Sequence, residues 1–466
     1  MNTATGTFWI EGRPQRVTGE LVISDDQFFK LKLKQFLVMP QQVTRNGNGF
    51  AYSVKPEHIV ADYEPVTIYG ELTDGTPVCL LDAHMEHGPA IGMHLQEYTG
   101  QRRIVGAHIA DDFAPIDGIR WGWNIALTEF APAPDETVTG ALQGSLSFWA
   151  PERQDGNPAG LAFTTDDPAP LRDLLIFVQS ACNQLVALWG GKRRVPQVVV
   201  TEILVGDKWC SYVVPESDDP KRIRTDLLPL KELSLKTFAK WIPFARRIDP
   251  NPYIANMATP NLQVGAQVLA TALEGLHRKL NEDKEVRPFA AVSKGAVTRA
   301  RRAAQRAGVC ALEEAGFVDL EFAQKRFSDS LGHVDQLSYA ERISDLATDV
   351  TGIVPGLFGP DLGKWVDLIK VIRNNQSHQL DEEFHEVRIS EYFVAVQTVQ
   401  WVLSLTILLK MAERDLLASA LAKSNTLHFT LANIDSEKVW EGFSALQTFE
   451  RAVSDDGPAG EVPASS

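Results

Sequence analysis

One short segment of the sequence combines residue types that could cleave RNA without a metal. It reads RNNQSH over residues 373–378, an arginine and a histidine separated by four polar residues. A histidine with a pKa of about 6.5 can take a proton from a ribose 2′-hydroxyl or give one to the leaving 5′-oxygen. An arginine can neutralise the charge on a five-coordinate phosphorus. This chemistry predicts a 2′,3′-cyclic phosphate and a 5′-hydroxyl, with Arg373 and His378 as catalytic residues and Asn374 orienting the ribose or phosphate.

The segment joins two long helices that the periodicity predicts over 361–380 and 391–422. The first has an apolar stripe formed by Trp365, Leu368, Ile369 and Ile372. At 3.6 residues per turn, Asn374 and His378 share one face of a helix, whereas Arg373 lies about 140° round from His378. A regular helix does not bring that pair together. Either the helix is distorted, or the site is a composite of two copies across a dimer interface.

The arginine–histidine spacing has little specificity by itself. Arg103 and His108 match the same loose pattern in a predicted strand, and Arg326 and His333 match it across a predicted helix end at Gly332. Only the RNNQSH segment follows an arginine with polar residues between two long amphipathic helices. The competing interpretation of this segment is a surface arginine followed by a capping histidine.

Composition and charge describe an ordinary water-soluble protein that needs a local basic patch to hold RNA. The chain has 466 residues, of which 44% are hydrophobic and 23% charged, so collagen-like, coiled-coil and wholly disordered classes are excluded. Its formal charge of −15 repels nucleic acid at long range. The predicted helix 297–316 carries the best candidate RNA-binding cluster, formed by Arg299, Arg301, Arg302 and Arg306. The alternative is an exposed helix face that pairs with Glu313 and Glu314 elsewhere in the bundle.

No motif predicts a metal or a cofactor. The four cysteines are widely spaced without a CxxC pair, which favours reduced thiols in a cytoplasmic protein. The sequence DAHMEH (82–87) resembles a ligand cluster, but we place it in a loop between strands and favour a solvated turn over a metal site. G-x-S-x-G, H-E-x-x-H and G-x-G-x-x-G motifs are absent from the sequence.

The chain divides into β-rich and helical parts. Short alternating runs separated by turn residues predict an antiparallel β-sandwich or barrel in a domain over 1–230, which also holds a helix over 170–189. A helical linker over 231–255, an all-α bundle over 256–430 and an extension over 431–466 with a disordered tail complete the prediction. Residues 392–409 carry no charge, but five polar side chains interrupt them, which favours a buried core helix over a membrane span.

The helix–RNNQSH–helix unit, with an earlier helix of the form ALEGLHR (272–278), resembles the HEPN superfamily of ribonucleases and nucleotide-binding bundles. The opening GTFWIEGRPQRVTGELVI (6–23), followed by a KW-containing linker and this bundle, looks more narrowly like the ApeA-type anti-phage proteins. The resemblance implies that Arg373 and His378 are catalytic, that Asn374 is a supporting polar residue, and that Glu274 is an acidic residue near the site.

The resemblance also implies a function. We expect a dimeric, metal-independent endoribonuclease that cuts host or phage RNA during infection, with tRNA as a candidate target. The homodimer would form through the HEPN bundle, and the β-domain would sense a phage-derived trigger or restrain the bundle until infection. The alternative is a non-catalytic bundle that binds a nucleotide or a partner, with a ligand-binding β-domain.

Overall fold

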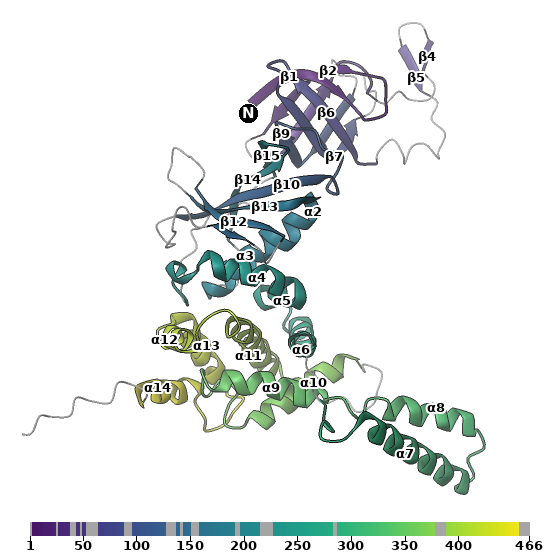
Figure 1. Cartoon of the computed structure of the whole chain (residues 1–466), viewed down its shortest axis with the longest axis vertical. Helices are drawn as coiled ribbons and strands as arrows, with labels where there is room; N and C mark the ends of the chain where they lie inside the picture. The colour runs from purple at the N-terminus through teal and green to yellow at the C-terminus, as the bar shows by residue number, and fades with distance from the viewer. Residues whose placement is uncertain are drawn as a thin grey trace, which may run out of the picture. The chain divides into compact units, whose positions relative to one another are not determined.

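The computed structural model shows two compact units, one formed by most of the chain up to Arg246 and one by most of the chain after it. The structure describes residues 2–24, 27–37, 43–46, 49–52, 64–87, 96–126, 137–139, 143–150, 158–191, 196–214, 227–282, 287–377 and 388–455. The first unit is rich in strands and the second is helical (Figure 1). The predicted fold class, α+β by domains, is therefore confirmed.

The strands of the first unit have these bounds: β1 Asn2–Trp9, β2 Val17–Ile23, β3 Phe29–Leu33, β4 Val43–Asn46, β5 Gly49–Tyr52, β6 Val66–Leu72, β7 Pro77–His87, β8 Gln96–Gly100, β9 Arg102–Val105, β10 Pro115–Ala126, β11 Thr137–Thr139, β12 Gly144–Trp149, β13 Pro158–Pro170, β14 Val198–Val205 and β15 Lys208–Val213. All but β4 and β5 belong to one antiparallel sheet. Its strands β7, β6, β1, β2, β3 and β8 close into a barrel because β8 pairs with both β3 and β7.

The barrel is filled by every second residue of its strands. Phe8, Leu21, Leu31, Ile68 and Leu80 are among the fully enclosed side chains of this core. Alternation places these residues on the inner face while their neighbours face outward, as the period of a strand requires. The prediction of a sandwich or barrel thus resolves in favour of a barrel.

The sheet continues beyond the barrel and is covered there by helices. Trp121 and Trp123 of β10 are fully buried, as predicted for core residues. The Trp123 indole N–H donates to Asn183 of α3 (Ala181–Trp189) at 2.6 Å, and Trp241 of α4 (Leu235–Ile248) donates to the Ala181 carbonyl at 2.6 Å. The segment that we predicted as part of a separate linker therefore packs α4 into the first unit.

The helix predicted over 170–189 is present: it starts after β13 ends at Pro170, with α2 (Leu171–Leu174) and a π-helical turn over Leu175–Ser180, and continues into α3. One local prediction in this unit is wrong. The DAHMEH segment, predicted to lie in a loop, belongs to β7. Its exposed His84 and Glu86 alternate with buried Met85, and the Glu86 carboxylate pairs with Lys30 at 3.0 Å. Alternation places Asp82, His84 and Glu86 on the same exposed face of the strand, where Arg102 pairs with Asp82 and Lys30 pairs with Glu86.

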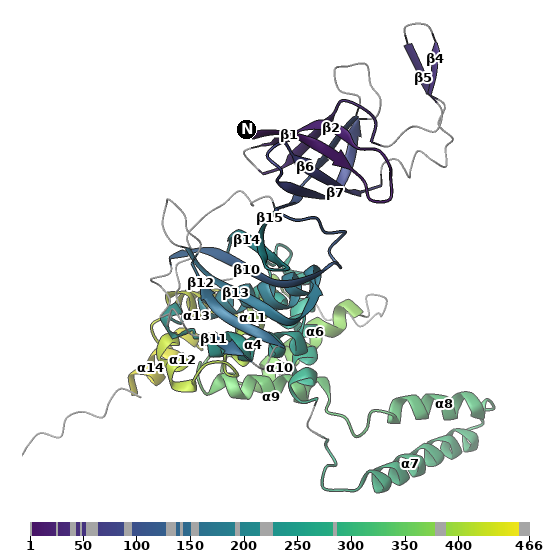
Figure 2. The same ribbon diagram turned by 45° about the horizontal axis from the view of Figure 1, so that its top comes forward.

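The helices after α4 have these bounds: α5 Asn251–Asn256, α6 Leu262–Leu280, α7 Lys294–Glu314, α8 Leu320–Leu331, α9 Tyr339–Thr351, α10 Leu362–Ser377, α11 Ile389–Leu408, α12 Arg414–Leu421, α13 Asn425–Ser436 and α14 Ala445–Asp455. Helices α6, α9, α10 and α11 pack together as a bundle (Figure 2). The helix predicted over 391–422 is two helices, because the chain leaves α11 at Leu409 and a new helix starts after Glu413.

Helix α11 is the centre of this bundle. It is long and apolar enough to cross a membrane, but 78% of its apolar window is buried inside the unit. The predicted core helix is confirmed. Two of its buried polar side chains have partners: the Trp365 indole donates to Thr398 at 2.8 Å, and Gln400 donates to the Met257 carbonyl at 3.0 Å.

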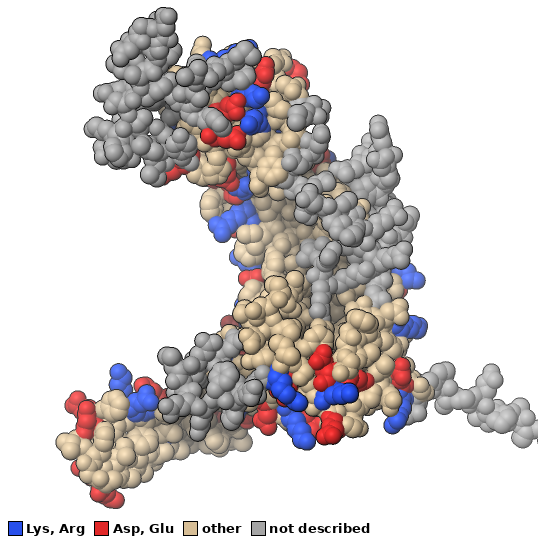
Figure 3. Space-filling view, turned by 180° about the vertical axis from the view of Figure 1, so that it is seen from behind, with Lys and Arg blue, Asp and Glu red and all other residues tan. Residues whose placement is uncertain are grey.

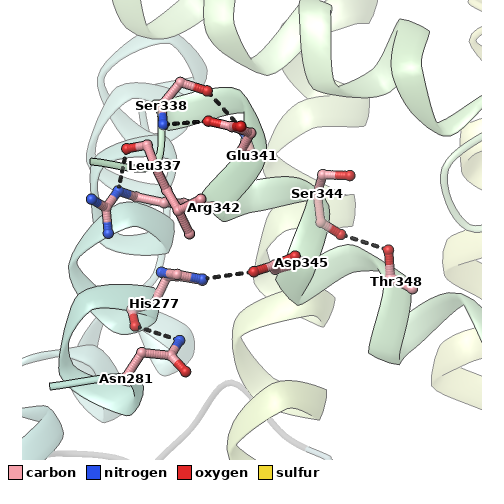
Figure 4. Close-up of polar contacts among 9 residues, drawn as sticks. All are labelled: His277, Asn281, Leu337, Ser338, Glu341, Arg342, Ser344, Asp345 and Thr348. Atoms are coloured by element: carbon pink, nitrogen blue, oxygen red, sulfur yellow. Dashed lines mark hydrogen bonds and ion pairs between the residues drawn. The ribbon is translucent and has the colours of Figure 1, made fainter. Parts of the chain in front are cut away.

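A buried histidine joins α6 to α9 (Figure 4). The His277 side chain is about as enclosed as the leucines beside it, and its Nε2 lies 3.1 Å from Oδ2 of Asp345, whose side chain is mostly exposed. Burial lowers the pKa of His277, the Asp345 carboxylate opposes that shift, and the charges of Arg342 and Arg278 add to it. The neutral imidazole therefore donates one hydrogen bond across the two helices.

We expect this histidine to contribute more stability at about pH 7.5 than at about pH 5. Because its folded-state pKa is lowered, the unfolded chain binds more protons just below the ordinary value of 6.5, and stability is lost as the pH falls through that window. Urea unfolding of the wild type and His277→Gln should show a difference in unfolding free energy that shrinks on acidification. A difference that stays constant or widens contradicts this account of His277.

Candidate active site

The last described turn of α10 carries Arg373, the arginine of the RNNQSH segment. Trp365, Ile369 and Ile372 on the same helix are fully buried and fix its inner face in the bundle. This packing leaves Arg373 at the edge of the core, with 36% of its side chain exposed, and leaves Asn374 exposed. The described part of the helix ends at Ser377, and His378 lies outside the described residues. Its angle to Arg373 therefore stays a prediction.

A carboxylate on α6 holds the Arg373 guanidinium. Nη2 of Arg373 donates to Oε2 of Glu274 at 2.9 Å, and the other oxygen of that carboxylate accepts from Nη2 of Arg278 at 2.7 Å. Only 16% of the Glu274 side chain is exposed, so this contact is better shielded from solvent than an ordinary surface pair. Two arginines share one carboxylate, and the group therefore keeps a positive charge that suits a phosphate.

An aromatic ring on α9 supports the other side of the guanidinium. The Cζ atom of Arg373 lies 4.5 Å from the centre of the Tyr339 ring, within the range of a cation–π interaction. The Tyr339 hydroxyl donates to the Ala270 carbonyl of α6 at 2.9 Å, which fixes the ring. Burial raises the pKa of this hydroxyl, the positive charge of Arg373 opposes that shift, and the group stays protonated. Three helices thus converge on Arg373.

Sequence reasoning brought Glu274 and Arg373 together through the resemblance, and it missed Tyr339. Tyr339 follows the capping residue Ser338, whose side chain accepts from the Glu341 N–H while Glu341 accepts from the Ser338 N–H. That pattern identifies the start of a helix. It carries no signal that the ring of Tyr339 meets an arginine 34 positions later in the chain.

The arrangement equips Arg373 to bind an anion. Its guanidinium has five N–H donors in a fixed plane, and the contact to Glu274 engages one end of that plane. The carboxylate and the ring hold the group in one orientation before a ligand arrives, and such preorganisation is what stabilises a developing charge on phosphorus. Asn374 is exposed beside it on the same helix, where its amide can meet the same ligand.

The four predicted RNA-binding arginines lie on a different helix pair from this group. Arg299, Arg301, Arg302 and Arg306 are on α7, which packs against α8, whereas Arg373 contacts α6 and α9. Within the described part of the chain, these four arginines form no ion pair with Glu313 or Glu314. Whether they bind RNA stays a prediction.

The two other arginine–histidine pairs that match the spacing of the RNNQSH segment lie in different parts of the fold. Arg103 is buried in β9 and donates to the carbonyl and side chain of Gln27 at 2.6 Å, while His108 bonds the Gly70 carbonyl at 2.9 Å. Arg326 and His333 are separated by the end of α8 at Gly332, as predicted. For a metal, the described residues offer no group of three or more His, Cys, Asp or Glu side chains.

Comparison with known families is consistent with the architecture of both units. A family model described as Apea-like HEPN matches residues 268–413, which include Glu274, Tyr339 and the RNNQSH segment. A model described as ApeA N-terminal domain 1 matches residues 3–117, which include the barrel. No curated protein and no solved structure matches the chain. The two domains point to a nuclease-type protein of anti-phage defence. The chain is an ApeA-like protein with a C-terminal HEPN domain.

Proposed function

We propose that this protein is a metal-independent endoribonuclease of an anti-phage, abortive-infection system, with tRNA as a candidate substrate. The observation that carries the proposal is the preorganised guanidinium of Arg373, held by Glu274 and Tyr339 five residues before His378. The match to the Apea-like HEPN family over the same helices supports it.

The reaction needs a base, an acid and a stabiliser of charge. A base takes the proton of the ribose 2′-hydroxyl, and the 2′-oxygen forms a bond to the adjacent phosphorus. The bond from phosphorus to the 5′-oxygen breaks, and an acid gives that oxygen a proton. We assign proton transfer to His378, charge stabilisation to Arg373 and orientation of the ribose or phosphate to Asn374. The products are a 2′,3′-cyclic phosphate and a 5′-hydroxyl.

A homodimer through the HEPN bundle fits this chemistry. One histidine cannot be base and acid at the same moment, and a two-fold arrangement would bring two copies of RNNQSH to one phosphate. It would also remove the need for Arg373 and His378 of one copy to converge across about 140° of a regular helix. The dimer is part of the proposal.

Purified protein incubated with total tRNA in EDTA tests the assignment. We expect the wild type to cut, and we expect Arg373→Ala and His378→Ala each to lose about 100-fold or more in rate, because each removes charge stabilisation or proton transfer. The matched control is Arg451→Ala, an exposed arginine on α14 that should cut like the wild type.

Equal cleavage by the wild type and both active-site variants would place the activity elsewhere and end the RNNQSH assignment. If the wild type binds a nucleotide but cleaves no tRNA, whether or not lysate from phage-infected cells is added, the result would instead favour the non-catalytic binding module.

The support for Arg373 can be tested separately. Tyr339→Leu removes the ring face and should lower kcat/KM about 5-fold, since a cation–π contact of this kind is worth about 1 kcal/mol. Tyr339→Phe keeps the ring face and should stay near the wild type. Glu274→Ala should lower kcat/KM about as much as Tyr339→Leu. If Tyr339→Phe lowers kcat/KM as much as Tyr339→Leu does, the hydroxyl and not the ring supports Arg373.

A further inference from the structure

The two helices α7 and α8 form a hairpin with almost no core of its own; we call residues 294–331 the arm (Figure 1). Helix α7 has 21 residues and none of them is buried, and α8 buries only Ala323. Where the arm joins the rest of the helical unit, Arg287 pairs with Asp335 at 2.6 Å and connects the segment before α7 to the segment after α8. Most helices in proteins are stable because an apolar face is buried. Most of the arm's surface is therefore available for contact with a partner.

The seam between the two helices is narrow and specific. The Phe327 ring lies against Gly308, where a Cβ atom would come within 2.6 Å of it, and Gln305 donates to the Gln324 carbonyl at 2.9 Å. This close approach fixes which face of α7 points toward α8. The opposite face of α7 points away from the seam and is open to a partner.

The free end of the arm is apolar. Four large apolar side chains are exposed around the turn between the helices: Leu312 at 36%, Phe317 at 40%, Val318 at 91% and Phe322 at 54%. Exposed apolar side chains grouped in this way mark a contact surface.

Charge along the arm is divided into two halves. Arg299, Arg302 and Arg306 are spaced by three and four residues, so they form one exposed stripe in the first half of α7. Glu313 continues the same face, and Glu314, Asp319 and Glu321 are exposed and lie next to the apolar residues in the sequence. Figure 3 shows acidic side chains gathered at the free end of the arm, at the lower left, with basic ones next to them.

We propose that the arm binds the arm of a second copy of this chain in an antiparallel pair. A two-fold axis near Gly308 sets residue 302 of one copy level with residue 314 of the other, and residue 306 level with residue 310. The basic half of each arm then meets the acidic end of the other, and both contacts form at once because the interface is isologous. Opposite charges along two helices select partner and direction in this way.

The same charges fit RNA less well. The arm holds seven basic and five acidic residues, so it is nearly balanced, and its acidic apolar end repels phosphates. The pairing of arms does not depend on the proposed ribonuclease activity, and RNA bound along the arginine stripe is the competing outcome of the test.

Cysteine cross-linking of the full chain reports on the pair directly. Cys310 is exposed, whereas Cys79, Cys182 and Cys210 are buried. In the proposed register the two copies of Cys310 lie on facing helices about 10 Å apart, within reach of a short bismaleimide. We expect a covalent dimer from the wild type and none from Cys310→Ser.

Charge reversal then tests the register. A stripe variant (Arg299→Glu, Arg302→Glu, Arg306→Glu) and an end variant (Glu313→Lys, Glu314→Lys, Glu321→Lys) should each lower the cross-linked fraction about 10-fold, since like charges now face each other. A mixture of the two variants should restore it as a mixed dimer, which also shows that both variants are folded.

Three results would overturn the proposal. The wild type gives no cross-linked dimer, the reversed variants cross-link like the wild type, or the mixture fails to restore the dimer while each variant keeps its helical circular dichroism. If the wild type does not cross-link and the stripe variant alone loses affinity for tRNA in filter binding, the arm binds RNA instead of a second copy.

Discussion

The helical unit depends on the burial of α11. A run of 18 mostly apolar residues without a charge favours burial, and neighbouring helices enclose most of it. Thr398 and Gln400 are tolerated in this core because each has a hydrogen-bond partner. Thr398 accepts from the Trp365 indole N–H, and Gln400 donates to the Met257 carbonyl. The partner of Thr398 is Trp365 of α10, so a hydrogen bond inside the core links α11 to the helix that carries the RNNQSH segment.

The positioning of Arg373 depends on that packing. Helices α6, α9 and α10 pack against one another and against α11, and the side chains at their edges meet without any loop: Glu274 from α6, Tyr339 from α9 and Arg373 from α10. A site built on rigid helices keeps its geometry better than one built on a loop. The carboxylate that holds Arg373 also limits its charge, so a phosphate must compete with Glu274 for the guanidinium.

Individual helices and strands are easier to predict from the sequence than the contacts between them. Apolar periodicity predicted α7 and α10 within a few residues, and alternation predicted a β-rich first domain, because burial of one face imposes a local pattern on the sequence. Closure of the barrel depends on β7 meeting β8, and α11 ends at Leu409, where the sequence LKMAE (409–413) has no Gly or Pro to mark a helix end. Tyr339 was missed for the same reason, since its contact with Arg373 exists only after the helices pack.

The most direct test of the ribonuclease account is the chemistry of the cut ends. Mass spectrometry of tRNA fragments produced in EDTA should show 2′,3′-cyclic phosphates and 5′-hydroxyls, and a 2′-deoxy substitution at the cleaved nucleotide should block the cut. These results would establish attack by the neighbouring 2′-oxygen. Fragments with 5′-phosphates and 3′-hydroxyls, or cleavage that tolerates the 2′-deoxy substitution, would show attack by water and contradict the roles given to Arg373 and His378.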